Sequence, residues 1–323
     1  MTSTALTFIV PVRSDARRLS RCLASIHDTC GSQPYELIVA DNGSTDDSAD
    51  VARAAGARVL ALPGLRVSVV RNTAAAKARS PLLAFIDADH ALASSWMPAA
   101  LAVMADGTVT AAGAQYHPPP DGTWVQRMYD RLRRHRPGTR DTGWLPSGNL
   151  VVRAEAFARL GGFDTALETC EDVDFCQRLV ASGGRLVETD RMASIHYGDP
   201  ATLKALFFGE LWRGRDNLTV SLRGPRTLRA LPGILLPLLH LAGLALVVAG
   251  VLLPWMRSVV IGFGLLLIVA TVGLRWLALV SQRQGAGSLV ADAIQALAVA
   301  FTYTTARALA LVVRTGHDTR KRG

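Results

Sequence analysis

The chain has 323 residues, of which 50% are hydrophobic and 19% are charged, and its mean hydropathy is +0.24. A chain of this length holds about two domains with a sizeable core, which excludes intrinsic disorder. The four cysteines are too few for a disulfide-rich miniprotein and form neither a CxxC pair nor a zinc motif, so we expect free thiols.

The charges are unevenly distributed along the chain. The net charge is +9, yet of the 26 acidic residues only Asp292 and Asp318 follow Asp216. The first two thirds therefore mix both signs, whereas the last third is apolar with basic flanks. This distribution is typical of a soluble domain followed by membrane segments with basic residues at the lipid surface. Aromatic residues are not interleaved with the basic ones, so we expect no nucleic-acid partner.

Strands and helices alternate in the first half of the chain. Short buried apolar runs predict four strands, and amphipathic spacing between them predicts helices at 15–27, after the loop at 41–47, and near 73–78. Ser44 or Thr45 is the expected N-cap of the second helix. The predicted strands are 6–12, 36–40, 59–62 and 82–86. This order predicts an α/β fold with a parallel sheet that carries helices on both faces.

Acidic residues follow several of these strands. Ligands of such a sheet bind beyond the carboxyl ends of its strands, where Asp15, Asp41 and the pair Asp87 and Asp89 are expected. Further along, the sequence predicts a basic helix at 126–136, a turn at 161–164, and a helix that begins at Glu171.

The last third contains two apolar stretches long enough to span a bilayer, at 233–253 and 259–280, joined by a turn at 254–257. A buried hairpin of a soluble domain is the alternative. Five arginines precede the first stretch and orient both ends of the hairpin to the cytoplasm. They are Arg213, Arg215, Arg223, Arg226 and Arg229.

The segment 289–313 is less apolar and has two interpretations. A third span would place Arg314, Arg320, Lys321 and Arg322 outside, so we favour a helix lying at the cytoplasmic interface. The N-terminal apolar run lacks a basic segment before it and is too short for a signal peptide, so we expect the first domain to stay in the cytoplasm.

Three acidic motifs point to chemistry. Asp87 and Asp89 end a strand and can both reach one hard cation, although two acids also end strands without any metal. Asp41 lies beside a glycine turn and can accept hydrogen bonds from a nucleoside, or serve only the turn. Glu171, Asp172 and Asp174 lie together at the start of a helix. Neighbouring carboxylates raise one another's pKa, which suits a general base. Alternatively, the three acids only stabilise the helix through its dipole.

Taken together and in order, these pieces resemble the inverting family 2 glycosyltransferases of the GT-A fold, over roughly residues 5 to 200. The fold implied is a nucleotide-diphospho-sugar transferase domain, with a mostly parallel mixed sheet flanked by helices, followed here by C-terminal transmembrane helices. The matching segments are FIVPV at 8–12, ELIVADNGSTD at 36–46, AFIDAD at 84–89, SGN at 147–149, GGFD at 161–164 and EDVD at 171–174.

The resemblance implies roles for particular residues. Asp172 would be the base that deprotonates the acceptor hydroxyl, and Asp87, Asp89 and His196 would hold Mn²⁺ or Mg²⁺ on the donor diphosphate. His196 is otherwise an ordinary histidine at a strand end. The donor itself would be contacted by Pro11, Asp15, Asp41, Asp87, Asn149 and Glu171. Arg71, Lys77 and Arg79 lie between the third and fourth strands and could reach phosphates, with Lys77 the one we assign to the donor site.

The expected activity is transfer of one sugar from a nucleotide-diphosphate sugar to a saccharide or lipid-linked acceptor, at the cytoplasmic face of a bacterial inner membrane. The first motif continues as Arg13-Ser14-Asp15 where the family often has an aromatic residue, Asn and Glu, which leaves the nucleotide open. Gln177 and Arg178 do not form the QxxRW motif of processive synthases, so we expect no polymerisation.

Two other functions fit parts of the pattern. A catalytically silent scaffold that binds nucleotide sugars would lack metal-dependent turnover, and a nucleotidyltransferase would need a glycine-rich phosphate loop after the first strand, which 11–15 does not contain. The expected domains are a catalytic domain at 1–205, a basic juxtamembrane segment at 206–231, a transmembrane hairpin at 232–281, and an interfacial helix with a basic tail at 282–323.

Overall fold

The computed structural model describes residues 4–133, 137–224, 231–252, 257–283 and 288–313. They form two compact units, the first made of the described residues within 4–119 and 137–199 and the second of those within 120–133 and 200–313. The expected first domain ran without interruption to 205, so the structure differs in assigning 120–134 to the second unit. Several expected features lie outside the described residues, namely Arg226, Arg229, the turn at 254–256 and the basic tail from Arg314 onward.

The first unit is built on an eight-stranded mixed sheet in the order β3-β2-β1-β4-β8-β6-β9-β7. Strands β1 to β4 are parallel where they pair, as predicted, while β8 is antiparallel to both β4 and β6. A separate pair, β5 and β10, is antiparallel. The strands are β1 (Leu6–Val12), β2 (Glu36–Asp41), β3 (Arg58–Ala61), β4 (Leu82–Ile86), β5 (His90–Leu92), β6 (Val109–Gly113), β7 (Thr139–Thr142), β8 (Asn149–Arg153), β9 (Arg185–Thr189) and β10 (Ser194–His196).

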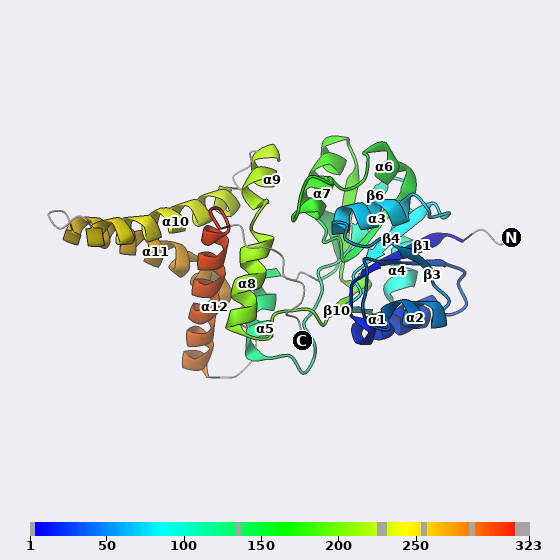
Figure 1. Ribbon diagram of the computed structural model, residues 1–323, viewed down its shortest axis with the longest axis horizontal. Coiled ribbons are helices and arrows are strands. Elements are labelled where there is room, and N and C mark those ends of the chain that lie inside the picture. The colour runs from blue at the N-terminus through cyan, green and yellow to red at the C-terminus, as the bar shows by residue number, and fades with distance from the viewer. Residues whose placement is uncertain (1–3, 134–136, 225–230, 253–256, 284–287, 314–323) are drawn as a thin grey trace. The chain divides into compact units, whose positions relative to one another are not determined.

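Helices cover both faces of this sheet (Figure 1). Side chains alternate along a strand, so Phe8 and Val10 of β1 pack into the core on one face while Ile9 packs into the core on the other. Residues of α1 (Ala16–Cys30), α2 (Ser48–Ala54) and α4 (Trp96–Met104) belong to the first core, and those of α3 (Val67–Ala75), α6 (Ala154–Arg159) and α7 (Glu171–Ala181) to the second.

The predicted N-cap of the second helix is wrong. Helix α2 begins at Ser48, after Asp47, because the expected cap residues bind the neighbouring loop instead. The Ser44 hydroxyl accepts the backbone N–H of Ser14 at 2.9 Å, and the Ser14 hydroxyl accepts that of Thr45 at 3.0 Å. The loops after β1 and β2 are thereby fastened together at the edge where ligands bind in such sheets.

Two predicted helices shift along the chain. Helix α3 covers Val67–Ala75 and not 73–78, because Val70, Arg71 and Ala74 form a buried face that starts earlier. The predicted helix at 126–136 is observed as α5 (Trp124–Asp130) followed by the short 3₁₀ helix η1 (Arg131–Arg133), while 134–136 lie outside the described residues. Thr123 caps α5 in a reciprocal capping box with Gln126.

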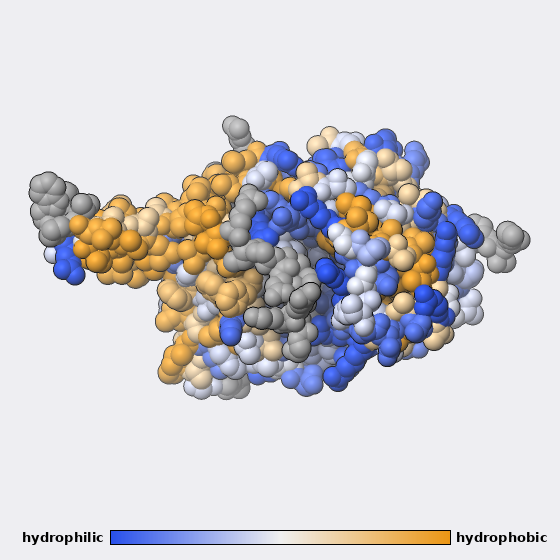
Figure 2. Space-filling view, viewed as in Figure 1, coloured by the Kyte–Doolittle hydropathy of each residue, from blue (hydrophilic) through white to orange (hydrophobic). Residues whose placement is uncertain are grey.

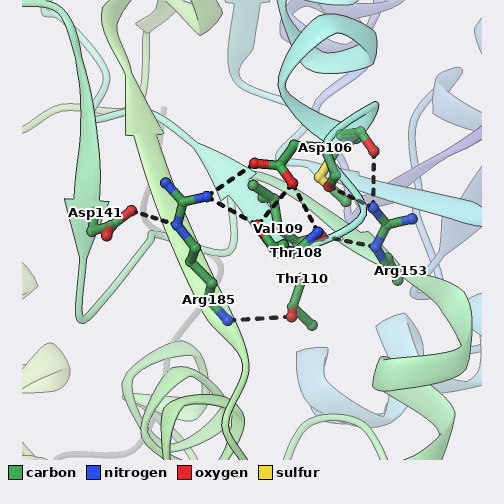
Figure 3. Close-up of polar contacts among 8 residues, drawn as sticks. Asp106, Thr108, Val109, Thr110, Asp141, Arg153 and Arg185 are labelled. Carbon is green, nitrogen blue, oxygen red and sulfur yellow. Dashed lines mark hydrogen bonds and ion pairs between the residues drawn. The ribbon is translucent and has the colours of Figure 1, made fainter.

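Two arginines fasten the edge of the sheet at the amino ends of β6 and β9 (Figure 3). The Arg185 guanidinium contacts Asp141 of β7 at 2.8 Å and Asp106 at 3.0 Å. Arg153 donates to the carbonyls of Val109 and Met104. These charge-assisted contacts hold the end of the sheet remote from the carboxyl ends of β1 to β4.

The second unit is helical, with α5, η1, α8 (Leu203–Arg213), α9 (Asn217–Arg223), α10 (Leu231–Leu252), α11 (Arg257–Val280) and α12 (Leu289–Leu309). Three of the described helices, α10, α11 and α12, are long and apolar enough to cross a membrane. Helices α10 and α11 match the hairpin predicted at 233–253 and 259–280. Length and composition leave open whether α12 spans.

The turn at 161–164 generates a prediction about stability. Gly161 and Gly162 both have positive φ angles, but a Cβ on Gly162 would lie 2.6 Å from the Asn72 side chain, whereas one on Gly161 would meet nothing within 4 Å. Asn72 in turn binds the backbone of Phe163 on both its N–H and C=O. We expect Gly162→Ala to cost about 1–3 kcal/mol more than Gly161→Ala, because steric overlap adds to the shared backbone strain. Thermal unfolding of the two variants in detergent tests this, and equal transition temperatures would contradict it.

Candidate active site

Four segments meet at the carboxyl edge of the parallel strands. Asp41 is the last residue of β2, and Asp87 directly follows β4. The neighbouring strand β8 runs the other way, so the loop that precedes it reaches the same edge, where the Asp87 N–H donates to the Gly148 carbonyl at 3.3 Å. The start of α7 completes the site with Glu171 and Asp172.

Asp15 and Asp41 shape the two loops on the β1–β2 side of this edge. Asp15 caps α1 by accepting the Arg18 N–H and also pairs with the Arg18 guanidinium at 3.0 Å. Asp41 accepts the Ser44 N–H at 2.8 Å. Pro11, which has no N–H, lies in β1 beyond its last pairing with β4, at Ile9, so no ladder bond to β4 is lost there. These residues are brought to the predicted edge together.

Arg71 of α3 is a residue whose importance we underestimated from the sequence. Its side chain is 4% exposed and contacts Asp87 at 2.5 Å through Nη2 and Glu171 at 2.6 Å through Nη1. Burial opposes its charge, yet the carboxylates of Asp87 and Glu171 raise its pKa, so it stays charged. A signal was present in the spacing, because Arg71 stands on the buried face of α3 with Val70 and Ala74.

Gly148 is required by a close approach between the strand end and the loop. A Cβ at this position would lie 2.6 Å from Oδ2 of Asp87 and 3.1 Å from Nε2 of His90. Any side chain here would push the carboxylate and the imidazole away from the loop. This explains in steric terms why a glycine occupies the middle of the Ser147-Gly148-Asn149 segment.

Asp89, His90 and His196 form a group that could hold a metal ion, with one ligand atom from each lying within 4.8 Å of the others. The pairing of β5 with β10 places His196 opposite His90. Nε2 of His196 is 3.3 Å from Oδ2 of Asp89. Sequence reasoning named Asp89 and His196 but missed His90, although His90 directly follows the Asp87-Ala88-Asp89 motif.

Both histidines are oriented by bonds to their Nδ1 atoms. Nδ1 of His196 contacts the fully buried carboxylate of Asp199 at 2.7 Å, and Nδ1 of His90 contacts the Ser194 hydroxyl at 3.1 Å. Each Nε2 is therefore directed toward the group, as in metal sites where an outer partner fixes the imidazole. The donor set of two imidazoles and a carboxylate fits a divalent transition metal.

The two histidines differ in protonation. Burial and the neighbouring His196 lower the pKa of His90 to about 4, so it is neutral near pH 7. Burial opposes charge on His196, but Asp89 and Asp199 raise its pKa to about 9. A cation bound here would replace the proton on His196 Nε2, and the positive charge would stay beside Asp89.

Asp172 is held at the first turn of α7, where its two oxygens accept backbone N–H groups. Oδ2 accepts from Ser147 at 3.3 Å and Oδ1 from Val173 at 2.8 Å. Burial is the main cause that raises the pKa of Asp172 to about 7, and repulsion from the carboxylate of Glu171 is the second. A carboxyl group with this pKa can exchange a proton near neutral pH.

Two predicted donor-binding residues are not brought to this group. Asn149 is completely buried, and its side chain accepts from Trp96 at 2.6 Å and donates to the carbonyls of Ala114 and Met192. Lys77 is exposed and follows α3, and its carbonyl accepts from Arg58, the first residue of β3. Lys77 therefore lies toward the amino ends of the strands, at the opposite edge of the sheet.

Comparison with known proteins decides the family. Residues 7–160 match the model of Glycosyl transferase family 2. An uncharacterized glycosyltransferase of Mycobacterium bovis is 30% identical over 222 residues, which cover 65% of this chain and 93% of that protein. The chain belongs to glycosyltransferase family 2. The predicted family is thereby confirmed.

Other relatives of this glycosyltransferase carry more specific names. The pre-mycofactocin glycosyltransferase of Mycobacterium tuberculosis is 29% identical over 196 residues, covering 56% of this chain and 40% of that protein, so this chain spans less than half of that relative. The succinoglycan biosynthesis protein ExoA of Rhizobium meliloti is 27% identical over 280 residues, covering 81% of this chain and 83% of that protein.

A solved structure confirms the GT-A fold predicted for this glycosyltransferase. The mannosyltransferase PcManGT from Pyrobaculum calidifontis, in complex with GDP-Man and Mn²⁺, superposes with a TM-score of 0.59 at 16% identity. The match covers 96% of this chain and 86% of that one. At this identity the likeness concerns the fold.

Proposed function

We propose that this glycosyltransferase transfers a single sugar from a nucleotide-diphosphate sugar to an acceptor hydroxyl, with inversion at the anomeric carbon. One observation carries the proposal. Asp172, a carboxyl group whose pKa is raised to about 7, shares one edge of the sheet with Asp89, His90 and His196, a group that could hold a cation. Inversion by a single displacement needs one base for the acceptor and stabilisation of the leaving group, and this edge offers both.

Asp172 is the proposed base. Backbone N–H groups of Ser147 and Val173 hold its carboxylate in place, and it can take the acceptor proton while the acceptor oxygen attacks the anomeric carbon. Oε1 of Glu171 accepts from the Arg71 guanidinium and from the Ser147 hydroxyl, so we do not assign Glu171 the role of base. Instead, we assign Glu171 to positioning Arg71 beside Asp87.

Asp89, His90 and His196 would hold a divalent cation, which neutralises charge on the leaving nucleoside diphosphate when it is bound. Two imidazole ligands favour Mn²⁺ over Mg²⁺, so of the two expected ions we propose Mn²⁺. Arg71 donates to Oδ1 of Asp87, so Oδ2 is the oxygen that we propose for contact with the cation or the donor. Asp15 and Asp41 shape the loops proposed to contact the nucleoside, with Pro11 beside them in β1.

The membrane helices suggest where the acceptor is found. We infer a saccharide or lipid-linked acceptor at the cytoplasmic face of a bacterial inner membrane, because a hairpin able to cross the bilayer follows the first unit in the chain after the short helices α8 and α9. Arg213, Arg215 and Arg223 precede the hairpin, and Arg257 is the basic residue at its other end. This asymmetry favours the cytoplasm for the end that carries more arginines.

The first prediction concerns donor and metal binding. Detergent-purified protein should be stabilised by one of UDP, GDP and dTDP, and only with Mn²⁺, by about 2.7 kcal/mol at ~100 times the dissociation constant. Asp89→Ala should lose the shift, whereas Asp50→Ala, at an exposed residue of α2, should keep it. Thermal unfolding measures all three proteins. Absence of any shift in the wild type would favour a silent scaffold over an enzyme.

Asp172→Asn removes the proposed base while keeping the shape of the side chain. We expect sugar transfer from the matching donor to a membrane extract to fall by about 10²–10⁴-fold, with nucleotide-induced stabilisation nearly unchanged. Asp174→Asn is the matched control in the same helical turn, where the carboxylate pairs with Arg178 at 2.8 Å. Retained transfer in Asp172→Asn, or loss of binding without loss of transfer, would refute the assignment.

The raised pKa of Asp172 predicts the pH dependence of the wild-type enzyme. Only the deprotonated carboxylate accepts a proton, so the rate at saturating substrate should rise about tenfold per pH unit below pH 7 and level off above it. Glu171→Gln removes the neighbouring negative charge and should move the midpoint to lower pH. A rate that is constant from pH 5.5 to 8.5 would exclude Asp172 as the group that limits turnover.

A further inference from the structure

Helix α12 packs across the base of the α10–α11 hairpin. Its contacts with α11 come from the last turns of that helix, where Trp276 donates to the Ala293 carbonyl at 2.9 Å and Arg275 lies 4.3 Å from the Tyr303 ring centre. One contact with α10 is a hydrogen bond between His240 and the Thr305 hydroxyl. Figure 1 shows α12 running crosswise to the hairpin, which projects from it.

The rest of the hairpin packs on itself. A Cβ on Gly243 would lie 2.8 Å from the carbonyl of Gly264, and one on Gly250 would lie 2.6 Å from the side chain of Ile261. These small residues let α10 and α11 approach closely, as in membrane helix pairs. The hairpin therefore has two parts. In one part α10 and α11 pack against α12, and in the projecting part they pack against each other.

Charged residues lie along one face of α12. Asp292 binds the Arg131 guanidinium through two bonds of 2.9 and 2.6 Å, and Arg307 contacts Glu210 at 2.7 Å. Asp292 and Arg307 are about 22 Å apart along the helix at 1.5 Å per residue. If α12 crossed the membrane, the depths of these two ion pairs would differ by most of the thickness of the bilayer core. The segments that carry Arg131 and Glu210 would then also have to lie within the hydrocarbon.

Helix α8 lies beside α12 and cannot span a membrane. Leu206 shares a core with Ala296 and Ala300 of α12, and a Cβ on Gly214, just beyond α8, would lie 2.6 Å from Ala310. The two helices therefore follow each other in the same direction. Helix α8 has 11 residues and carries charged side chains near both ends, so it is far shorter than the roughly 20 residues that a span requires.

The opposite face of α12 is apolar and exposed. Val290, Ile294, Leu297 and Phe301 follow one another at helical spacing, and between 49% and 69% of each is exposed. Figure 2 shows hydrophobic residues over the hairpin and continuing along α12 on the side from which the hairpin projects. The exposed face of α12 is thus continuous with a surface that a bilayer would cover.

We propose that α12 lies in the plane of the membrane, with the stripe of Val290, Ile294, Leu297 and Phe301 embedded in the lipid of one leaflet, and that the α10–α11 hairpin alone crosses. In this arrangement both ion pairs sit at one depth on the polar side of α12, and α8 stays out of the hydrocarbon. Arg275 and Tyr303 then meet at the level of the headgroups, where tyrosine and arginine are favoured. The proposal does not depend on the transfer reaction.

Measurement of depth along α12 tests the proposal in the full chain reconstituted in phosphatidylcholine vesicles. Single cysteines replace Val290, Leu297 and Phe301, each is labelled with a fluorophore, and lipids carrying nitroxides at set depths quench it. The parent chain gives the background from Cys170, the native cysteine that is not fully buried. Labelled cysteines at Val259 and Leu266 on α11 serve as the spanning control, and their depths should differ by about 10 Å.

We expect the three α12 positions to report one shallow depth within a few ångströms, while the α11 pair shows its gradient. A gradient of about 16 Å between positions 290 and 301 would overturn the proposal in favour of a third span. Absence of lipid quenching along α12, with quenching intact on α11, would also overturn it, because the stripe would then face something other than lipid.

Discussion

A single buried guanidinium joins the two acidic motifs of this glycosyltransferase. Arg71 connects Asp87, at the end of β4, to Glu171, at the start of α7, and each contact is about as short as a charged hydrogen bond becomes. Without the Arg71 guanidinium, the buried carboxylate of Glu171 would face that of Asp87 with no positive charge between them. The position of α7, and with it the orientation of Asp172, therefore depends on Arg71.

Glycines allow the backbone to approach these charged groups closely. Gly148 leaves room for Asp87 and His90, and a Cβ on Gly198 would overlap the carboxylate of Asp89. The histidines are fixed from their outer side by Asp199 and Ser194. The site is thus held by steric contacts on one side and hydrogen bonds on the other, which limits how far its ligands can relax.

Much of this arrangement could be predicted from the sequence. The first four strands and the hairpin follow from apolar periodicity and length, and the positions of Asp87 and Asp89 follow from a strand end. The role proposed for Asp172 came from the resemblance to the family. The role of Arg71 depends on partners from two distant segments, and His90 meets Ser194 across 104 residues. The misplacement of Lys77 was avoidable, because the helix between two parallel strands returns the chain to the amino edge of the sheet. Asn149 was predicted to bind the donor because nothing in the sequence shows that its side chain is buried against Trp96 and Met192.

The segment at 120–134 belongs to the same unit as the three long apolar helices, although the chain reaches it in the middle of the first unit. Val125 and Met128 of α5 share a core with Leu206, Val272 and Ala296. A chain cut near residue 200 would keep α5 but lose this core, and would expose an apolar face to water. A fragment that holds the first unit alone would therefore require removal of 120–134 and of everything from residue 200 onward, with a linker from residue 119 to β7.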